Sequence, residues 1–258
     1  MMSDLIVESA NQILTLTLNR PRVMNALTKE MVREMKRVLH DAARDAQTRV
    51  VILRGAGDHF CSGADIRVEK NCAFVEYREF VSDIQDITRA LQNLDAVSIA
   101  AIQGYCLGGG MEIACACDLR VAAADAHLGF PEVGIGLTIT SGAAHLLPRL
   151  VGMTRAKELM LTGDAIDANT ANGMGLVNRV VAREALAATA SQLAEKIKAR
   201  APLAVATQKH LLDASADASL DAALRMEVDA ILTTFASHDG QEGMSAWIEK
   251  RAPVFVGR

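Results

Sequence analysis

Two glutamates lie in glycine-rich stretches near the middle of the chain. Glu112 comes two residues after the three glycines at 108–110 in SIAAIQGYCLGGGMEIACAC, which spans 98–117, and Glu132 lies in GFPEVGIG at 129–136. A carboxylate is costly to bury among apolar residues unless it has partners or a task. Either glutamate alone would usually be a solvated surface residue. The two together, each beside apolar segments, are candidates for general acid and base chemistry.

Glycines between a strand and a helix let backbone N–H groups approach a ligand closely, at the positive end of the helix. A phosphate loop is not indicated, because GxxxxGK[ST] is absent and LGGGME does not match GxGxxG. Tight packing of strand on helix is the alternative explanation. A second glycine turn, HFCSGADI at 59–66, also follows an apolar run, and an ordinary left-handed turn at Gly63 would explain it equally well. Spacing alone does not show that these segments meet.

Other nucleophiles and metal ligands are less promising. Cys115 and Cys117 fall in an apolar helical stretch, where residues two apart do not share a face, so we do not expect a metal site. The GxSxG motif of a serine nucleophile is absent. His127 and His145 flank the Glu132 segment, and structural roles are favoured for both.

Strand and helix patterns alternate along most of the chain. Apolar runs and period-two alternation predict strands at 14–18, 50–53, 98–102, 119–122 and 176–181. Apolar stripes predict helices from Thr28, its N-cap, and then at 73–94, after 141, at 154–161, 183–199, 202–214, 219–236 and 241–251. Strands that are apolar on both faces indicate an α/β fold with mainly parallel pairing. After Pro202 only helices are predicted.

The composition limits the classes of partner. Half of the 258 residues are hydrophobic, and 27 basic against 31 acidic side chains give a net charge of -4. This balance argues against nucleic acid or an anionic membrane as the main partner. Five cysteines and the start MMSDLIVES, which has no basic n-region, predict a reducing compartment. No apolar run approaches the ~20 residues that span a bilayer, so we expect a cytoplasmic protein.

Six segments together resemble one known family over nearly the whole chain. In order they are LNRPRVMNAL, FCSGADI, GYCLGGGMEIACACDLRVAA, LGFPEVGIGL, LTGDAIDANTANGMGLVNRVV and EGMSAWIEKRAPVF. They are similar to the enoyl-CoA hydratase/isomerase (crotonase) family. The resemblance implies an α/β fold, the ClpP/crotonase-like spiral of ββα units, over 1–200. It also implies a C-terminal helical appendage at 201–258 that serves oligomerisation and is not an independent domain.

The resemblance also implies the chemistry. In this family two backbone N–H groups hold the carbonyl oxygen of a CoA thioester, and by motif position they belong to Ala64 and Gly109. Each such donor is worth ~3–4 kcal/mol when negative charge develops on that oxygen. Glu112 and Glu132 match the two catalytic glutamates of the family's hydratases, which add water across a 2-enoyl-CoA. The glycines at 108–110 would then lack side chains because the substrate approaches the backbone there.

Binding of CoA and assembly follow from the same resemblance. The residues expected to contact CoA are Arg22, Ser62, Asp65, Ile66, Trp247 and Lys250. No metal and no separate cofactor are expected, since CoA is part of the substrate. The family forms trimers or dimers of trimers, and the apolar stripes after Pro202 are richer than a single core contact requires.

The loop after GIGL departs from the family pattern. Many relatives continue with Pro and a Gly-Gly pair, whereas this chain has TITSGAA at 138–144, where Thr140 or Ser141 could cap the next helix. The choice of acyl group therefore stays open. An isomerase, an aryl-enoyl-CoA hydratase-lyase, and a non-catalytic binding protein such as the RNA-binding relatives are the alternatives. The presence of both glutamates favours hydration, and the acidic balance disfavours RNA.

Overall fold

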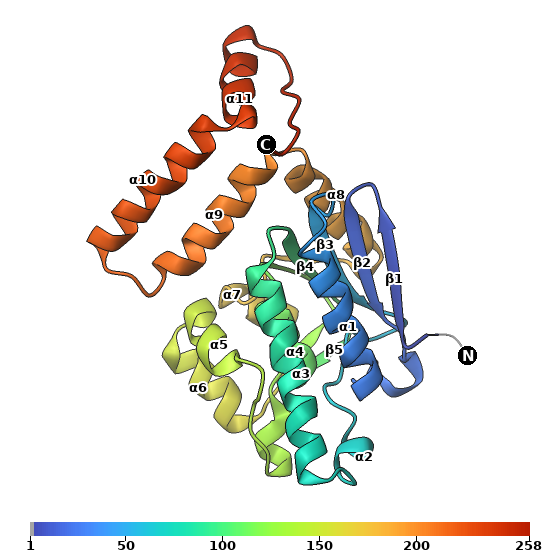
Figure 1. Ribbon diagram of the computed structural model, residues 1–258. Coiled ribbons are helices and arrows are strands. Elements are labelled where there is room, and N and C mark those ends of the chain that lie inside the picture. Colours follow the sequence, from blue (N-terminus) through green and yellow to red (C-terminus); the bar gives the residue numbers. More distant parts are fainter. Residues whose placement is uncertain (1–2) are drawn as a thin grey trace.

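A six-stranded sheet runs through the centre of the protein (Figure 1). The computed structural model describes residues 3–258, apart from the side chains of residues 68 and 69. The strand order is β1-β2-β3-β4-β6-β9, with β1 (Leu5–Ala10), β2 (Ile13–Leu18), β3 (Val50–Gly55), β4 (Val97–Ile102), β6 (Leu119–Ala123) and β9 (Arg179–Val181). Strands β1 and β2 pair antiparallel, and the other neighbours pair parallel. The predicted mainly parallel sheet is confirmed.

Both faces of this sheet are buried, as its continuous apolar strands require. On β3, Val51 and Leu53 belong to one hydrophobic core, whereas Val50 and Ile52 point to the opposite face and belong to a second core. The helices that supply the first core include α1 (Lys29–Ala42), α3 (Phe74–Asn93) and α4 (Gly109–Ala116). The second core is closed by α8 (Leu186–Lys198). The side chain of Thr28 caps α1 as predicted, since it accepts the N–H of Met31.

A three-stranded sheet stands beside the large one. It consists of β5 (Tyr105–Leu107), β7 (His127–Gly129) and β8 (Ile166–Asp167), with β5 parallel to β7 and β7 antiparallel to β8. The chain passes from β4 to β5 and into α4, and from β6 to β7 and onward to α5, so a strand of each sheet precedes a helix. These are the ββα units of the predicted spiral. The elements between them are η1 (Pro21–Val23), α2 (Ile66–Glu69), η2 (Pro131–Ile135), α5 (Ala143–Val151), α6 (Met153–Thr162), α7 (Ala168–Gly173) and η3 (Arg183–Ala185).

Short or exposed strands are the part of the fold that sequence periodicity did not predict. Five of the six residues of β1 are exposed, and β5, β7 and β8 have three residues or fewer, so none shows an apolar repeat. The strand predicted at 176–181 is wrong at its start, because only Arg179–Val181 pair with β6. Leu176 and Val177 are buried outside any strand. The last helix, predicted at 241–251, is α11 (His238–Glu249), which begins three residues before the predicted start.

The C-terminal helices form an arm that extends from the rest of the molecule (Figure 1). They are α9 (Pro202–Ser215), α10 (Leu220–Ala236) and α11. The buried ammonium of Lys209 on α9 fastens the arm: Nζ lies 3.0 Å from Asp118 Oδ2 and donates to the carbonyls of Leu91 and Ala96 at 3.0 and 3.2 Å. Asp118 Oδ2 also accepts the N–H and hydroxyl of Ser98, each at 2.7 Å.

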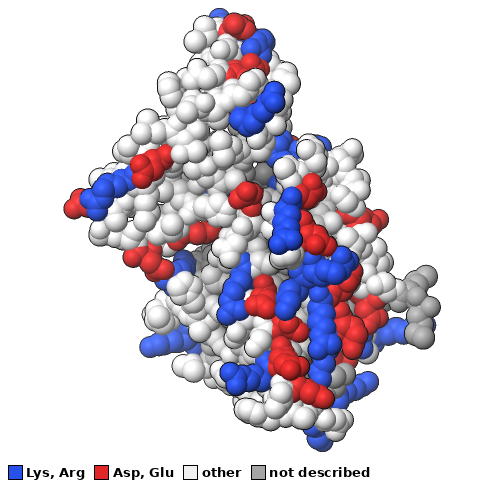
Figure 2. All heavy atoms as spheres, viewed as in Figure 1, with Lys and Arg blue, Asp and Glu red and all other residues white. Residues whose placement is uncertain are grey.

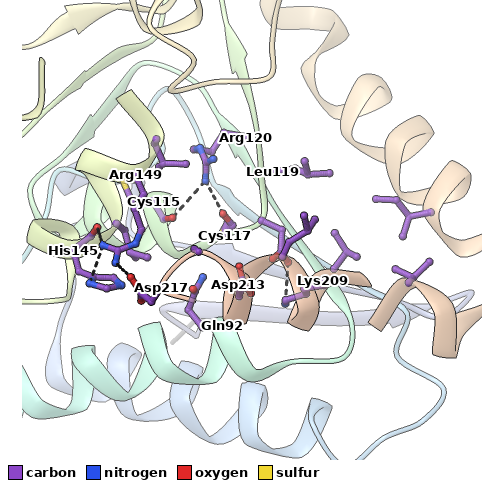
Figure 3. Close-up of a pocket in the computed structure, with 18 of the residues that line it drawn as sticks. Gln92, Cys115, Cys117, Leu119, Arg120, His145, Arg149, Lys209, Asp213 and Asp217 are labelled. Carbon is purple, nitrogen blue, oxygen red and sulfur yellow. Dashed lines mark hydrogen bonds and ion pairs between the residues drawn. The ribbon is translucent and has the colours of Figure 1, made fainter. Parts of the chain in front are cut away.

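A cavity of about 630 Å³ lies between this arm and the core (Figure 3). Arg120 is buried there, where its Nη1 donates to the carbonyls of Ala114 and Cys117 at 3.1 and 2.6 Å. The guanidinium thus caps the carboxyl end of α4, where a positive charge is favourable. Burial raises the pKa of the Cys115 and Cys117 thiols to about 12, so both side chains are neutral packing groups.

No helix among residues 3–258 combines the length and the apolar character that a membrane span requires.

The arm attachment can be tested with Lys209→Met. The change leaves Asp118 largely buried without its cation, which costs about 3 kcal/mol of the free energy of unfolding, or roughly 6–12 °C in Tm. Lys196→Met is the matched control, because Lys196 lines the same cavity but is exposed. Thermal denaturation compares the two variants, and an equal Tm would show that the ion pair does not hold the arm.

Candidate active site

The turn between β5 and α4 places a helix amino terminus beside a second carboxylate. Gly108 has φ +51°, a conformation that side chains with a Cβ rarely adopt, and its N–H donates to the Gly129 carbonyl at 3.0 Å. The helix begins at Gly109, and Glu112 lies in its first turn as predicted. A methyl group on Gly108 would lie 2.8 Å from Oε1 of Glu132, so the backbone turn and this carboxylate are in close contact.

The three consecutive glycines serve different purposes. A methyl group on Gly110 would lie 2.6 Å from Cβ of Cys61, so this glycine is required by packing inside the protein. The expectation that all three lack side chains because of the substrate is therefore wrong for Gly110. A methyl group on Gly109 would find its nearest atoms at 3.5 Å or beyond, which is ordinary contact. The protein itself leaves room at Gly109 alone among the three.

The loop that carries Ala64 lies against the start of α4. It is held by Leu27, whose N–H donates to the Gly63 carbonyl at 2.8 Å and whose carbonyl accepts the N–H of Asp65 at 3.0 Å. The N–H of Ala64 points away from this pairing, and a methyl group on Gly109 would lie 3.8 Å from its nitrogen. Within residues 3–258, neither the Ala64 nor the Gly109 N–H donates a hydrogen bond. Two unengaged amide donors thus meet at one cavity.

The stretch NRPRVMNAL shapes this loop from beneath. Asn25 is fully buried with φ +56°, and its Nδ2 donates to the carbonyls of Ala56 and His59 at 2.9 and 2.7 Å. The carbonyl of Met24 accepts the N–H of Ser62 at 3.0 Å. Asn25 was not predicted as a site residue. The available signal was an asparagine between two apolar segments, a residue type that tolerates the left-handed conformation.

Cys61 lies directly under the same loop and is completely buried. Burial raises the pKa of its thiol to about 12, and Sγ lies 3.2 Å from the Asn25 carbonyl, to which it donates. A thiol in this state is a packing group rather than a nucleophile.

Glu112 is buried, with 1% of its surface exposed, and is held by the loop that follows η2. Its Oε1 accepts the N–H groups of Thr140 and Ser141, each at 2.8 Å, and its Oε2 accepts the Thr140 hydroxyl at 3.2 Å. The prediction that Thr140 or Ser141 caps the next helix is wrong, because α5 follows Gly142 without a side-chain cap. Both residues instead lie in a turn whose N–H groups, together with the Thr140 hydroxyl, supply the hydrogen bonds that the buried carboxylate requires.

Both glutamates face one small cavity of about 80 Å³. Glu132 lies in the first turn of η2 and is half-buried. Ala64 and Gly109 line the same cavity, so the structure brings all four predicted residues together. Its apolar wall consists of Tyr77, Val81, Ile84, Ile135 and Leu137.

The residues expected to contact CoA divide into two groups. Ser62 and Ile66 line the cavity. Asp65 does not line it; its carboxylate accepts from Nη1 of Arg20 at 3.0 Å and so helps to fasten the loop. Arg22 is exposed on η1, whose C-terminal flank contacts Ser62 through backbone atoms. A CoA contact for Asp65 or Arg22 stays a prediction.

Trp247 and Lys250 lie far from this cavity. Trp247 lies in the last turn of α11 and Lys250 directly follows the helix, and Figure 1 shows α11 at the opposite end of the molecule from α2, which follows the Ala64 loop. Trp247 is 85% exposed. Within one chain they do not join the site, so a role in binding CoA requires a second copy and stays a prediction.

No group of three or more His, Cys, Asp or Glu side chains among the described residues is arranged to hold a metal ion. The site is thus a pair of carboxylates facing two amide donors, on a spiral of ββα units. Carboxyl groups and free amide donors at one cavity are groups that can move protons next to a polarised carbonyl group.

Comparisons with known proteins agree with this class. The family model for enoyl-CoA hydratase/isomerase matches residues 8–258. The chain is 38% identical to a crotonyl-CoA hydratase of Syntrophomonas wolfei, over 99% of this chain and 98% of that protein. It is 39% identical to a short-chain-enoyl-CoA hydratase of Clostridium acetobutylicum, over 97% and 96%. The crystal structure of an enoyl-CoA hydratase from Bacillus anthracis superposes with a TM-score of 0.96 at 37% identity, over 99% of this chain and 100% of that one. The chain belongs to the enoyl-CoA hydratase/isomerase family.

The different purposes of the glycines lead to a paired prediction. Gly109→Ala should fold with a Tm near that of the wild type and lower kcat/KM for crotonyl-CoA about ten-fold or more, because its methyl group intrudes between the two amide donors. Gly110→Ala should instead lower Tm, because its methyl group overlaps Cys61. Calorimetry and steady-state kinetics separate the effects. Wild-type kinetics in Gly109→Ala would contradict the assignment of these donors.

Proposed function

We propose that the protein is a 2-enoyl-CoA hydratase that adds water across the double bond of a trans-2-enoyl-CoA thioester. The observation that carries this proposal is the meeting of Glu112 and Glu132 at a cavity that also exposes the free N–H groups of Ala64 and Gly109. Hydration needs a base for the water, an acid for the α-carbon and donors for the thioester oxygen, and the cavity offers all three.

The geometry favours different roles for the two carboxyl groups, with Glu112 as the base and Glu132 as the acid. Glu112 accepts three hydrogen bonds, which hold its carboxyl group in one orientation at the cavity. It takes a proton from the water while the water oxygen bonds to C3. Negative charge moves through C2 to the thioester oxygen, which the N–H groups of Ala64 and Gly109 stabilise. Glu132 gives a proton to C2, and the two carboxyl groups then exchange a proton with solvent.

The acyl group is proposed to be short. The cavity is small, about 80 Å³, and apolar side chains of α3 and of the η2 loop line it together with the two glutamates. Two similar proteins are named for crotonyl-CoA and for short-chain enoyl-CoA substrates.

The reaction as proposed needs no cofactor, because CoA belongs to the substrate. The cytoplasmic location expected from the sequence stays a prediction.

Substitution of either glutamate tests the proposal directly. Glu112→Gln and Glu132→Gln should each lower kcat for crotonyl-CoA by ~10² or more, because general acid or base catalysis is lost while the side-chain shape is kept. Glu158→Gln, at an exposed glutamate of α6, is the control and should leave kcat unchanged. Loss of the enoyl-thioester absorbance gives the rate.

Near-normal turnover in both active-site variants would contradict the roles of the glutamates. The alternatives give different outcomes in the same experiment. Turnover of a 3-enoyl-CoA without hydration would identify an isomerase, and release of an aldehyde from an aryl-enoyl-CoA would identify a hydratase-lyase. No turnover of any thioester, together with retention of RNA, would identify a binding protein.

We also propose that the working form is a homotrimer or a dimer of trimers, assembled through the C-terminal arm. None of the 17 residues of α10 is buried, although the helix carries seven large apolar side chains that are exposed: Leu220, Leu224, Met226, Val228, Ile231, Leu232 and Phe235. Figure 2 shows the arm largely uncharged along α9 and α10, whereas charged groups gather over α1 and α3. An apolar face of this extent favours burial against another copy, which could also bring Trp247 and Lys250 to a neighbour's CoA.

Light scattering tests the assembly. The wild-type protein should have the mass of three or six chains, and Ile231→Glu should reduce it, because a carboxylate would be buried in the contact. Thr233→Glu is the control, because it adds the same charge two residues along α10, away from the apolar stripe. A monomeric wild-type protein would contradict the proposal.

A further inference from the structure

The backbone turn at Thr140 and Ser141 is held from two sides. Its N–H groups donate to Glu112, as described above, and its carbonyl groups face α3. Nε2 of Gln85 donates to the Thr140 carbonyl at 2.8 Å, and the hydroxyl of Thr88 donates to the Ser141 carbonyl at 2.8 Å. The peptide unit that joins Thr140 to Ser141 therefore accepts from Gln85 through its oxygen and donates to Glu112 through its N–H.

We propose that Gln85 and Thr88 are positioning residues for the reaction, which orient the carboxylate of Glu112 by fixing the turn that holds it. The inference rests on the proposed role of Glu112 as the base that activates water. Among the described residues, these two side chains hydrogen-bond to the turn and not to Glu112, and neither lines the cavity at the two glutamates. Both act through the turn at 140–141.

The helix α3 is a firm support for this turn. Ile84 and Ile87 anchor α3 in the main core. Gln85 and Thr88 each follow one of these isoleucines, on the side of α3 that meets the turn. Their spacing of three residues puts them on one helical face. The next residue of the turn, Gly142, also approaches α3, since a methyl group on it would lie 3.5 Å from Cγ2 of Thr88.

The support from α3 allows the loop at 138–144, which departs from the family pattern, to orient the carboxylate of Glu112. Both strong donors to Oε1 of Glu112 are backbone groups of Thr140 and Ser141, so the carboxylate moves wherever the turn moves. A displacement of about 1 Å in a reacting group can cost on the order of 10²-fold in rate. Hydrogen bonds in a chain also polarise one another, so a donor on the carbonyl strengthens the N–H on the same peptide unit.

The test compares Gln85→Met with Gln92→Met. Gln92 lies on the same helix and also donates to a backbone carbonyl, that of Ala116 at 2.9 Å, but it does not touch the turn at 140–141. It borders the large cavity under the arm (Figure 3). Both variants should lose a similar amount of Tm. Only Gln85→Met should lower kcat for crotonyl-CoA, about ten-fold, with KM changed less than two-fold, because the CoA contacts are untouched.

Thr88→Val, which removes only a hydroxyl group, provides a milder variant with the same expected direction if Gln85→Met fails to fold. A double-mutant cycle with Glu112→Gln shows whether the effect passes through the carboxylate. In the Glu112→Gln background, Gln85→Met should cause no further loss of kcat. Equal kcat in Gln85→Met and Gln92→Met, or a ten-fold loss that persists without the carboxylate, would overturn the inference.

Hydrogen exchange separates this inference from the proposed function. The amides of Thr140 and Ser141 should exchange faster in Gln85→Met than in Gln92→Met, whatever the substrate of the enzyme. A wild-type protein that does not hydrate crotonyl-CoA would refute the proposed function and leave this comparison intact. Unchanged exchange at both amides in Gln85→Met would refute the support that α3 gives to the turn.

Discussion

The burial of the Glu112 carboxylate is the constraint around which the site is built. A carboxyl group with 1% of its surface exposed must find its hydrogen-bond partners within the protein itself. The Thr140–Ser141 turn supplies these hydrogen bonds, and side chains of α3 donate to the carbonyl groups of that turn. The short helix that carries Glu112 is capped at its other end by the Arg120 guanidinium, which donates to backbone carbonyl oxygens. The precision of the carboxylate thus comes from elements far apart in the sequence.

The amide donors depend on a different set of contacts. The Ala64 loop and the Gly109 turn are brought together by backbone pairing with Leu27 and by the buried amide of Asn25. These bonds satisfy the neighbouring peptide groups and leave the N–H groups of Ala64 and Gly109 available. Hydrogen bonds within the protein itself thus place the carboxyl groups and the donors at one cavity. Preorganisation of this kind is the main source of electrostatic catalysis.

The sequence predicted the elements with strong periodicity and the residues with recognisable motifs. The buried strands at 50–53 and 98–102 were found because they are continuously apolar. The helices from Thr28, at 73–94 and in the arm were found because their apolar residues repeat at helical spacing. Glu112, Glu132, Ala64 and Gly109 came from motif positions, and the structure brings them to one cavity. The edge strand β1 and the small sheet were not predicted, because exposed strands and strands of three residues or fewer have no apolar repeat. Gln85, Thr88 and Asn25 were not predicted as site residues. Their side chains act through hydrogen bonds to backbone groups distant in the sequence, and no local sequence pattern indicates such bonds.

The central claim is that the N–H groups of Ala64 and Gly109 hold the thioester oxygen between the two glutamates. A crystal structure with butyryl-CoA, which lacks the double bond and cannot be hydrated, tests it most directly. The account predicts the thioester oxygen at about 2.7–3.1 Å from both backbone nitrogens, with the C2–C3 bond facing Glu112 and Glu132. A bound thioester whose oxygen contacts neither nitrogen, or whose acyl chain lies outside the cavity of the two glutamates, would contradict it.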